Sequence, residues 1–301
     1  ADDGLLYLDH SLPDERAREH FIVKFGRGRD ERLAQILRHE AVYMDLARLL
    51  GLRVHAPLTL RQRALFIPRF DRRIHPGGME RLGQESIASL TGKVGFEFVP
   101  SHDEVCRQLL LRCTDPQVEV LEYLRRDVAN LALGNKDNHA RNTALQRDFQ
   151  GYIALTPLYD FAPMYLHPDG IARRIRWENN DGAQIDWSRV LDAVCTQPTG
   201  SKKQRRLDRD RAEVVVGAEQ LVVGGQVGQH LLGVEAAIHR EQDFHRGLLV
   251  SWVGSSVGSW LAGQRRYFPI EPRRTTRRPG APGSGPQAGS RPARSCAHSP
   301  G

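Results

Sequence analysis

The sequence predicts an α+β fold, with a strand-rich first part and a mainly helical second part. Two patterns support this prediction. Up to about residue 70, short apolar and β-branched runs surround one stretch of helical periodicity. From residue 101 onward, apolar residues recur mainly at three- and four-residue spacing. The chain has 301 residues, of which 40% are hydrophobic, so it is long enough to bury a substantial core.

The first part is expected to run strand, helix, strand, strand. The segment HFIVKFG (20–26) is short, apolar and β-branched, and Lys24 projects from it. A helix follows over 33–50, where apolar residues fall three and four apart, and Gly51 ends it. The two further strands are VHAPLTL (54–60) and ALFIPRF (64–70).

Helix-start signals open the second part. Ser101, with Glu104 three residues later, forms a capping-box signature. Asp115 and Pro116 supply an N-cap and a first helical position for the next helix, which stops at Gly134. The segments that follow predict a hairpin and then a loop: TALQ and YIALTPL around RDFQG, and then LYDFAPM.

Charge is distributed unevenly along the chain. Residues 1–200 hold 27 Lys and Arg against 28 Asp and Glu, whereas residues 201–301 hold 16 against 8. The excess positive charge therefore lies in the last hundred residues. A basic tail can bind polyanions, but a solvated segment is the simpler interpretation. Residues 272–301 are rich in Pro, Gly, Arg and Ser, and we expect disorder there because so little surface can be buried.

These patterns divide the chain into three parts. We expect residues 1–72 to form a small strand-rich unit, residues 73–197 a helical unit, and residues 198–301 a basic, poorly ordered tail rich in Gly, Pro and Arg. Because the tail fits the rest poorly in composition and pattern, we expect it to be a frameshifted or aberrant C-terminus.

Several other protein classes are disfavoured. No run of about 18 or more apolar residues is present, and the first thirty residues are too acidic for a signal peptide. The four cysteines show neither CxxC pairing nor a histidine at metal-ligand spacing, which argues against a zinc site and a disulfide framework. We expect a cytoplasmic protein with reduced thiols and no membrane partner.

The nine residues GNKDNHARN (134–142) carry the strongest chemical signal. Asp137 is followed five residues later by Asn142, the spacing of a protein-kinase catalytic loop. Phosphoryl transfer needs a carboxylate to orient and deprotonate the attacking hydroxyl, and a carboxamide oxygen to hold magnesium. Asp160 would be the second metal ligand, because the predicted hairpin returns the chain to the same place and Mg²⁺ prefers oxygen ligands.

Two residues of the first part complete the set. Lys24 would pair with the phosphates, and Glu40 on the following helix would be its ion-pair partner. Taken singly, each has an ordinary explanation, since Asp and Asn favour turns and Lys and Glu are common solvated residues. His139 is interpreted as a structural residue that forms a hydrogen bond with the loop backbone, because Asp137 is already assigned as the base. The four roles in the right chain order favour a phosphotransferase.

The segments ALGNKDNHARNTAL and LTPLYDFAPM resemble the catalytic core of the HipA family, the serine/threonine kinase toxins of bacterial toxin–antitoxin modules. The resemblance extends from about residue 20 to about 195 through FIVKF, HEAVYMDLARLLGLRVH, FIPRFDRR, GIARRIRW and DWSRVLDAV. It implies Asp137 as the catalytic acid/base, Asn142 and Asp160 as magnesium ligands, and Lys24 on the ATP phosphates.

The resemblance also implies an architecture. A two-lobed protein-kinase-like fold is expected, with a partial, β-rich N-lobe over 1–72 and a mainly helical C-lobe. The hinge between the lobes would be Pro68, Arg69 and Phe70, with the Pro68 carbonyl and the Phe70 N–H facing adenine. Proline removes one backbone donor there but leaves the carbonyl.

The chain departs from the family pattern in two places. The family carries a phosphate loop with Gly, Ser and a lysine before the FIVKF-like strand, and ADDGLLYLDHSLPDERARE contains nothing similar. The chain also begins with Ala1. We therefore expect an N-terminally truncated fragment that lacks this loop. The atypical tail, where further C-lobe helices should continue, is the second departure.

The favoured function is an ATP- and Mg²⁺-dependent protein serine/threonine kinase of toxin–antitoxin type. The resemblance implies a cytoplasmic protein substrate, with an aminoacyl-tRNA synthetase as a candidate, and a helix-turn-helix antitoxin partner through which DNA is contacted indirectly. One alternative is a catalytically inactive, antitoxin-binding module of a repressor complex. Another is a small-molecule phosphotransferase, because such enzymes share the same placement of Asp and Asn.

Overall fold

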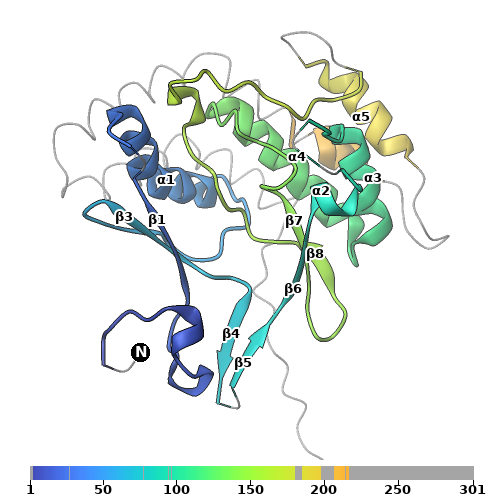
Figure 1. The fold of residues 1–301 in the computed structure, drawn as a ribbon. Coiled ribbons are helices and arrows are strands. Elements are labelled where there is room, and N and C mark those ends of the chain that lie inside the picture. Colours follow the sequence, from blue (N-terminus) through green and yellow to red (C-terminus); the bar gives the residue numbers. More distant parts are fainter. Residues whose placement is uncertain are drawn as a thin grey trace, which may run out of the picture.

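The computed structural model places a small antiparallel sheet and one long helix beside a group of helices (Figure 1). A hairpin extends away from both, near the N-terminus (Figure 1). The structure describes residues 3–26, 28–76, 78–93, 95, 97–179, 185–197, 207–213 and 215–216.

The N-lobe is a three-stranded antiparallel sheet with a helix packed against it (Figure 1). Its strands, in spatial order, are β1 (Phe21–Phe25), β3 (Ala64–Pro68) and β2 (Thr59–Arg61). The helix is α1 (Glu31–Leu49). The Asp30 side chain caps it by accepting the N–H of Arg32 at 2.8 Å. Gly51 follows the helix with φ of +76°, a conformation that favours glycine.

The strand expected over 54–60 is wrong over most of its length, because β2 covers only its end. Pro57 has no N–H to give to a ladder. The backbone of Arg53, just upstream, is also bound elsewhere: its N–H donates to Glu122 at 3.0 Å, and its carbonyl accepts the N–H of Leu158 at 2.7 Å. The chain is therefore bound to the C-lobe at Arg53, immediately before this segment.

Two pieces of sheet are not predicted by the sequence. The first is an antiparallel hairpin of β4 (Arg72–His75) and β5 (Gly78–Arg81). The second is β6 (Gly83–Ser86), which pairs with β7 (Ala144–Arg147). The predicted hairpin that includes β7 and β8 (Ile153–Leu155) is confirmed. The short helical segments are α2 (Ile87–Leu90), η1 (Asp9–Ser11), η2 (Asp14–Arg16) and η3 (Met164–Leu166).

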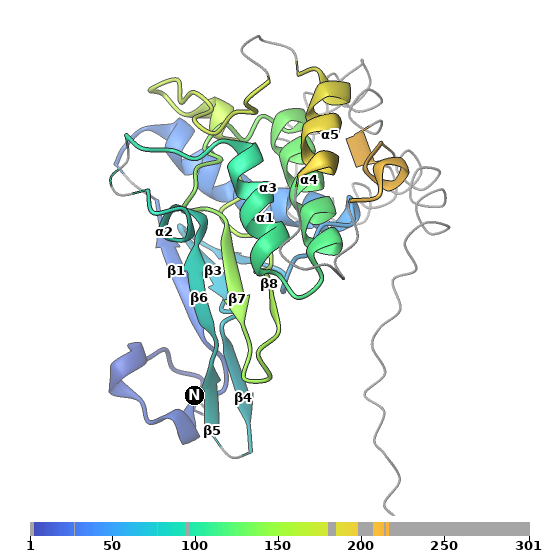
Figure 2. The same cartoon turned by 90° about the vertical axis from the view of Figure 1, so that its right-hand side faces the viewer.

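The C-lobe is built on three helices that lie side by side in Figure 2: α3 (His102–Arg112), α4 (Pro116–Ala132) and α5 (Trp187–Thr196). Ser101 caps α3 as expected, accepting the N–H of Glu104 at 3.0 Å. Asp115 makes no cap bond to α4 and instead accepts the Tyr152 hydroxyl at 2.7 Å. No helix in the described part is long and apolar enough to cross a membrane.

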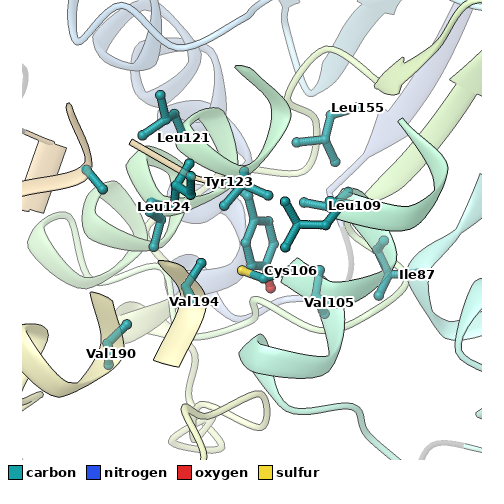
Figure 3. Packing of buried hydrophobic residues seen from close by; sticks show 14 of the residues in the cluster. Ile87, Val105, Cys106, Leu109, Leu121, Tyr123, Leu124, Leu155, Val190 and Val194 are labelled. Atoms are coloured by element: carbon teal, nitrogen blue, oxygen red, sulfur yellow. The ribbon is translucent and has the colours of Figure 1, made fainter. Parts of the chain in front are cut away.

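A large apolar cluster fills the C-lobe between these helices. Cys106 and Leu109 of α3 face Tyr123 and Leu124 of α4, and Val194 of α5 closes the cluster (Figure 3). Each of these side chains is at most 3% exposed. Burial of such side chains supplies the main favourable term in folding.

The same cluster takes in residues that the sequence analysis assigned to the tail. Leu207, Ala212, Val215 and Val216 are all buried in it. These apolar residues of the expected tail therefore pack on the C-lobe, and the division of the chain at residue 197 stays a prediction. The remainder of the expected tail, 198–206, 214 and 217–301, lies outside the described residues.

A second apolar cluster joins the two lobes. It contains Met44 of α1 and Leu65 of β3 from the N-lobe. Leu133 at the end of α4, together with Leu158 and Phe161 beyond β8, comes from the C-lobe. The lobes therefore share a core next to the segments that carry Asp137 and Asp160, in addition to the connection through the chain.

Candidate active site

Lys24 is positioned by the sheet and by α1. On β1 it lies opposite Leu65, a fully buried residue of β3. Its Nζ lies 2.7 Å from Oε1 of Glu40 on α1. The Glu40 side chain is 4% exposed, and burial raises the pKa of its carboxyl although Lys24 opposes the rise. The structure thus brings these two predicted residues together as an ion pair.

Asp160 contacts the same ammonium group through Oδ1, from 136 residues further along the chain. Burial by itself would lower the pKa of Lys24, but the attraction of Glu40 and Asp160 outweighs burial and leaves the pKa raised. Lys24 therefore carries its charge at neutral pH. It joins a strand, a helix and the loop after β8 at one point.

The backbone of Asp160 is strained. Its φ is +55°, in the left-handed region that non-glycine residues rarely occupy. Its neighbours fix this conformation: the Phe161 ring packs 5.6 Å from that of Tyr43, and the Tyr159 hydroxyl donates to the Arg141 carbonyl at 2.8 Å. Burial, helped by Asp160, raises the pKa of Tyr159 to about 12, so that hydroxyl remains a donor.

Asp137 and Asn142 lie in one compact turn after α4. The N–H of His139 donates to the Asp137 carbonyl at 3.0 Å, and the N–H of Asn142 donates to the His139 carbonyl at 2.9 Å. The side-chain nitrogen of Asn142 also donates to the Asp137 carbonyl, at 3.0 Å. The Asn142 side chain also lines the same small cavity as Asp160.

The Asp137 carboxyl is influenced by the other predicted residues. Burial raises its pKa, His139 and Lys24 oppose the rise, and the negative charge of Asp160 adds to it. These interactions require the side chains to be within electrostatic reach of one another. The Asp137 carboxyl is therefore sensitive to the charges of Asp160 and Lys24, which come from two other segments.

His139 holds the turn. Its Nδ1 accepts the N–H of Arg141 at 3.3 Å, so it contacts the loop backbone in the way expected from the sequence. Its Nε2 lies 3.9 Å from Oδ1 of Asp137. The ring is thus fixed on one side by the backbone and presents the other side to the carboxylate.

The predicted hinge begins at the end of β3. The N–H of Arg69 donates to the His20 carbonyl at 2.8 Å, so the alternation of an antiparallel ladder makes Pro68 and Phe21 a non-hydrogen-bonded pair. The Pro68 carbonyl therefore points away from β1. The Arg69 guanidinium is bound to Asp71 at 2.6 and 2.8 Å, which leaves Arg69 only its backbone for a ligand.

Phe70 connects the hinge to the loop of Asp160. Its ring lies 5.9 Å from that of Tyr159, the residue before Asp160, and 6.4 Å from His55. The hinge is therefore next to the predicted metal loop, although no direct contact joins Pro68 or Arg69 to Lys24.

Sequence reasoning missed the buried polar face of α4. A small cavity is lined by Asn142 and Asp160 on one side and by Asp127 and Asn130 of α4 on the other. Asp127 is 1% exposed and accepts hydrogen bonds from Arg173 at 2.6 Å and from the Trp177 indole at 2.9 Å. Charged residues three and four apart on an otherwise apolar helix are the signal that could have located this face.

Comparison with known proteins supports the resemblance noted in the sequence. The model of the HipA-like C-terminal domain matches residues 5–220. The "Putative kinase Y4mE" of Sinorhizobium fredii is 34% identical over 142 residues, which make up 44% of this chain and 33% of that protein. The chain thus spans about a third of the length of this curated relative.

Solved structures show a similar fold. The HipA protein of Shewanella oneidensis, solved in complex with HipB and operator DNA, aligns over 82% of this chain and 58% of its own, with 20% identity and a TM-score of 0.50. The Helicobacter pylori kinase CtkA aligns more weakly over 67% of this chain and 86% of its own, with 15% identity and a TM-score of 0.40. The likeness to the Shewanella protein confirms the predicted α+β, kinase-like fold.

Proposed function

We propose, on the premise that this chain belongs to the HipA-like C-terminal domain family, that its site binds ATP with magnesium and transfers the γ-phosphoryl group to a protein hydroxyl. The observation that carries the proposal is the meeting of three segments at one ammonium group. Lys24 holds both Glu40 and Asp160, and the turn with Asp137 and Asn142 lies within electrostatic reach.

The donor atoms fit a magnesium ion with its nucleotide. Asn142 and Asp160 offer a carboxamide and a carboxylate oxygen on the same cavity, and Mg²⁺ is commonly held by one or two such ligands together with substrate phosphates. No group of three or more His, Cys, Asp or Glu side chains gathers as a metal cluster in the described part of the chain. When bound, the ion would neutralise charge on the phosphate oxygens.

The other residues would handle the substrate and its proton. Asp137 would orient the attacking hydroxyl and accept its proton, and the burial that raises the pKa of Asp137 makes it a stronger base than a solvated carboxylate. When ATP binds, Lys24 would keep its ion pair with Glu40, and phosphate oxygens would replace Asp160 as its second partner. Glu40 is buried on α1, so the position of Lys24 would be preserved during this exchange.

Adenine would lie against the hinge. The Pro68 carbonyl points away from β1, and β2 pairs with β3 only as far as Phe66, so the carbonyl would be available as an acceptor. The Phe70 N–H would be the matching donor. The side chain of Arg69 would take no part, because Asp71 holds it.

The identity of the substrate and partner belongs to the same proposal. We take the substrate to be a serine of a cytoplasmic protein, with an aminoacyl-tRNA synthetase as a candidate. A helix-turn-helix antitoxin would be the partner and would provide the only link to DNA. The complex of Shewanella HipA with HipB and operator DNA supports this choice.

A phosphotransfer assay tests the proposal. A bacterial lysate is divided into a protein fraction and a fraction of low-molecular-weight compounds. Each fraction is incubated with the wild-type chain, γ-³²P-labelled ATP and magnesium, and the radioactive label is measured in each. We expect label in protein, and its loss in Asp137→Asn without loss of nucleotide binding. Label in small molecules alone would instead identify a small-molecule phosphotransferase, and equal transfer by wild type and variant would refute the role of Asp137.

The second candidate is a catalytically inactive module that binds the antitoxin. Residues 1–20 of the sequence contain no glycine-rich phosphate loop. Such a module would bind the antitoxin equally well with and without ATP and would label nothing. Titration with the cognate antitoxin, in the presence and absence of nucleotide, separates the two candidates.

A further inference from the structure

We propose that Arg53 is a positioning residue that joins the exit of α1 to the strand leading into Asp160, and so fixes the two carboxylates that share Lys24. The inference deepens the proposed function, since it matters for catalysis only if Asp160 holds metal. It rests on a set of hydrogen bonds that connect Arg53, two buried glutamates of α4 and the end of β8.

The Arg53 guanidinium forms a two-pronged contact with Glu119. Nη1 lies 2.9 Å from Oε2, and Nη2 lies 3.0 Å from Oε1. The same Nη1 donates to the Leu155 carbonyl at 2.9 Å. Glu119, only 1% exposed, also accepts the N–H of Leu155 at 2.9 Å. Both backbone groups of Leu155 are therefore bound to this ion pair.

The backbone of Arg53 adds a second connection. Its carbonyl accepts the N–H of Leu158 at 2.7 Å, two residues before Asp160. Its own N–H donates to Oε1 of Glu122 at 3.0 Å. The chain thus crosses from the N-lobe onto the C-lobe at Arg53 and binds there through side chain and main chain together.

Arg126 completes the arrangement. Its Nε donates to Oε1 of Glu122 at 2.9 Å, and its Nη2 donates to the Thr156 carbonyl at 2.8 Å. Glu122 and Arg126 are each 4% exposed. The segment 155–158 is consequently held at four backbone groups by the Arg53 and Arg126 network.

This network explains how a strained residue can be held in place. Asp160, with φ of +55°, can keep that conformation only if its surroundings determine it. The fixed segment 155–158 supplies this support from the N-terminal side. On the other side of Arg53, Leu52 bonds back to Ala47 of α1 at 3.0 Å, so α1 with Glu40 belongs to the same frame.

The geometry requires arginine. A guanidinium offers a planar fork for a carboxylate and a further donor for the Leu155 carbonyl, whereas the ammonium of lysine is a point charge. Arg53→Lys therefore keeps the charge but loses the fork. The matched control is Arg81→Lys, because Arg81 makes the same two-pronged contact with Asp14, at 2.9 Å for both bonds, but on the exposed surface.

The test combines amide hydrogen exchange with nucleotide binding. In Arg53→Lys we expect faster exchange at Leu155 and through 156–162, with α3 and α5 unchanged, because opening is local. We also expect affinity for ATP with magnesium to fall by roughly 10-fold or more, the effect of losing a residue that orients a metal ligand. Arg81→Lys should match wild type in both measurements.

Each outcome decides the proposal. Unchanged exchange over 155–162 in Arg53→Lys would overturn it, and so would faster exchange spread evenly over α3 and α5, which indicates a general loss of stability. If wild type binds no ATP with magnesium, the proposed function fails, while the exchange of 155–162 still decides whether Arg53 positions this segment. Local loosening with unchanged affinity would overturn the link to Asp160.

Discussion

Nζ of Lys24 lies 2.7 Å from Oε1 of Glu40, across the gap between β1 and α1. The two side chains differ in burial: that of Glu40 is 4% exposed, whereas that of Lys24 is 32% exposed. A buried carboxylate needs a partner to offset the loss of hydration. The pair therefore fixes the lysine, whose outer side is directed to the Asp160 loop.

Glu40→Gln should destabilise the protein and weaken ATP binding together. The variant leaves Lys24 without its buried partner, and the cost to the free energy of unfolding should be about 1–3 kcal/mol. Chemical denaturation and ATP titration measure the two effects. Asp45→Asn, which removes the more exposed Asp45–Arg48 pair on the same helix, should change stability by no more than about 0.5 kcal/mol.

Asp137→Asn should raise the thermal stability at pH 7. Burial raises the pKa of Asp137 in the folded protein above its value of 3.8 in the unfolded chain, so stability falls as the pH rises from 3.8 and the loss is complete once the pH exceeds the folded-state pKa. The amide removes that cost. Well below pH 3.8, where the wild-type carboxyl is protonated in both states, the advantage should disappear. A melting temperature equal to that of wild type at pH 7 would contradict this account.

Gly134→Ala should destabilise the start of the Asp137 turn. Gly134 has φ of +68°, and an added Cβ would lie 2.8 Å from Cδ1 of Tyr165. We expect a loss of about 2–4 kcal/mol from backbone strain and overpacking together. Gly170→Ala has a similar φ of +63° but no atom within 4 Å of the new Cβ, so it should cost only the backbone term, about 1–2 kcal/mol. Equal losses in denaturant melts would rule out the contact with Tyr165.

Stability should fall as the pH drops from about 6.5 to about 4 because of His102. Full burial lowers the pKa of His102 to about 4, so the unfolded chain takes up a proton in this window and the folded protein does not. The slope from this residue is about 1.4 kcal/mol per pH unit. The measurement is the change of the unfolding free energy with pH. In His102→Gln, unfolding over this window should take up one proton fewer than in wild type, so the slope should be smaller. An unchanged slope would exclude His102 as its origin.

The elements predicted correctly are those whose signals are local. The periodicity of α1, the Gly134 stop after α4 and the β7–β8 hairpin depend on neighbours within a few residues. The order of Lys24, Asp137 and Asp160 along the chain predicts a phosphotransferase site, since a known chemistry specifies that order, and this assignment stays a prediction.

What the sequence could not predict depends on long-range contacts. The Arg53–Glu119 pair joins residues 66 apart, and neither residue is distinguished locally from a solvated charge. The packing of Leu207 and Val215 on the C-lobe was likewise hidden by the charged residues between them, because composition alone does not show which face of a polar helix is buried.

The central claim is that Asn142 and Asp160 hold magnesium for ATP, and calorimetric titration of wild type and Asp160→Asn tests it most directly. Asparagine tolerates the positive φ of residue 160, so this variant removes charge without adding backbone strain. We predict that wild type binds ATP only with magnesium, and that Asp160→Asn binds about 10-fold more weakly or worse, since a hard cation loses a charged ligand. Equal affinity of the two proteins for ATP with magnesium would contradict the account.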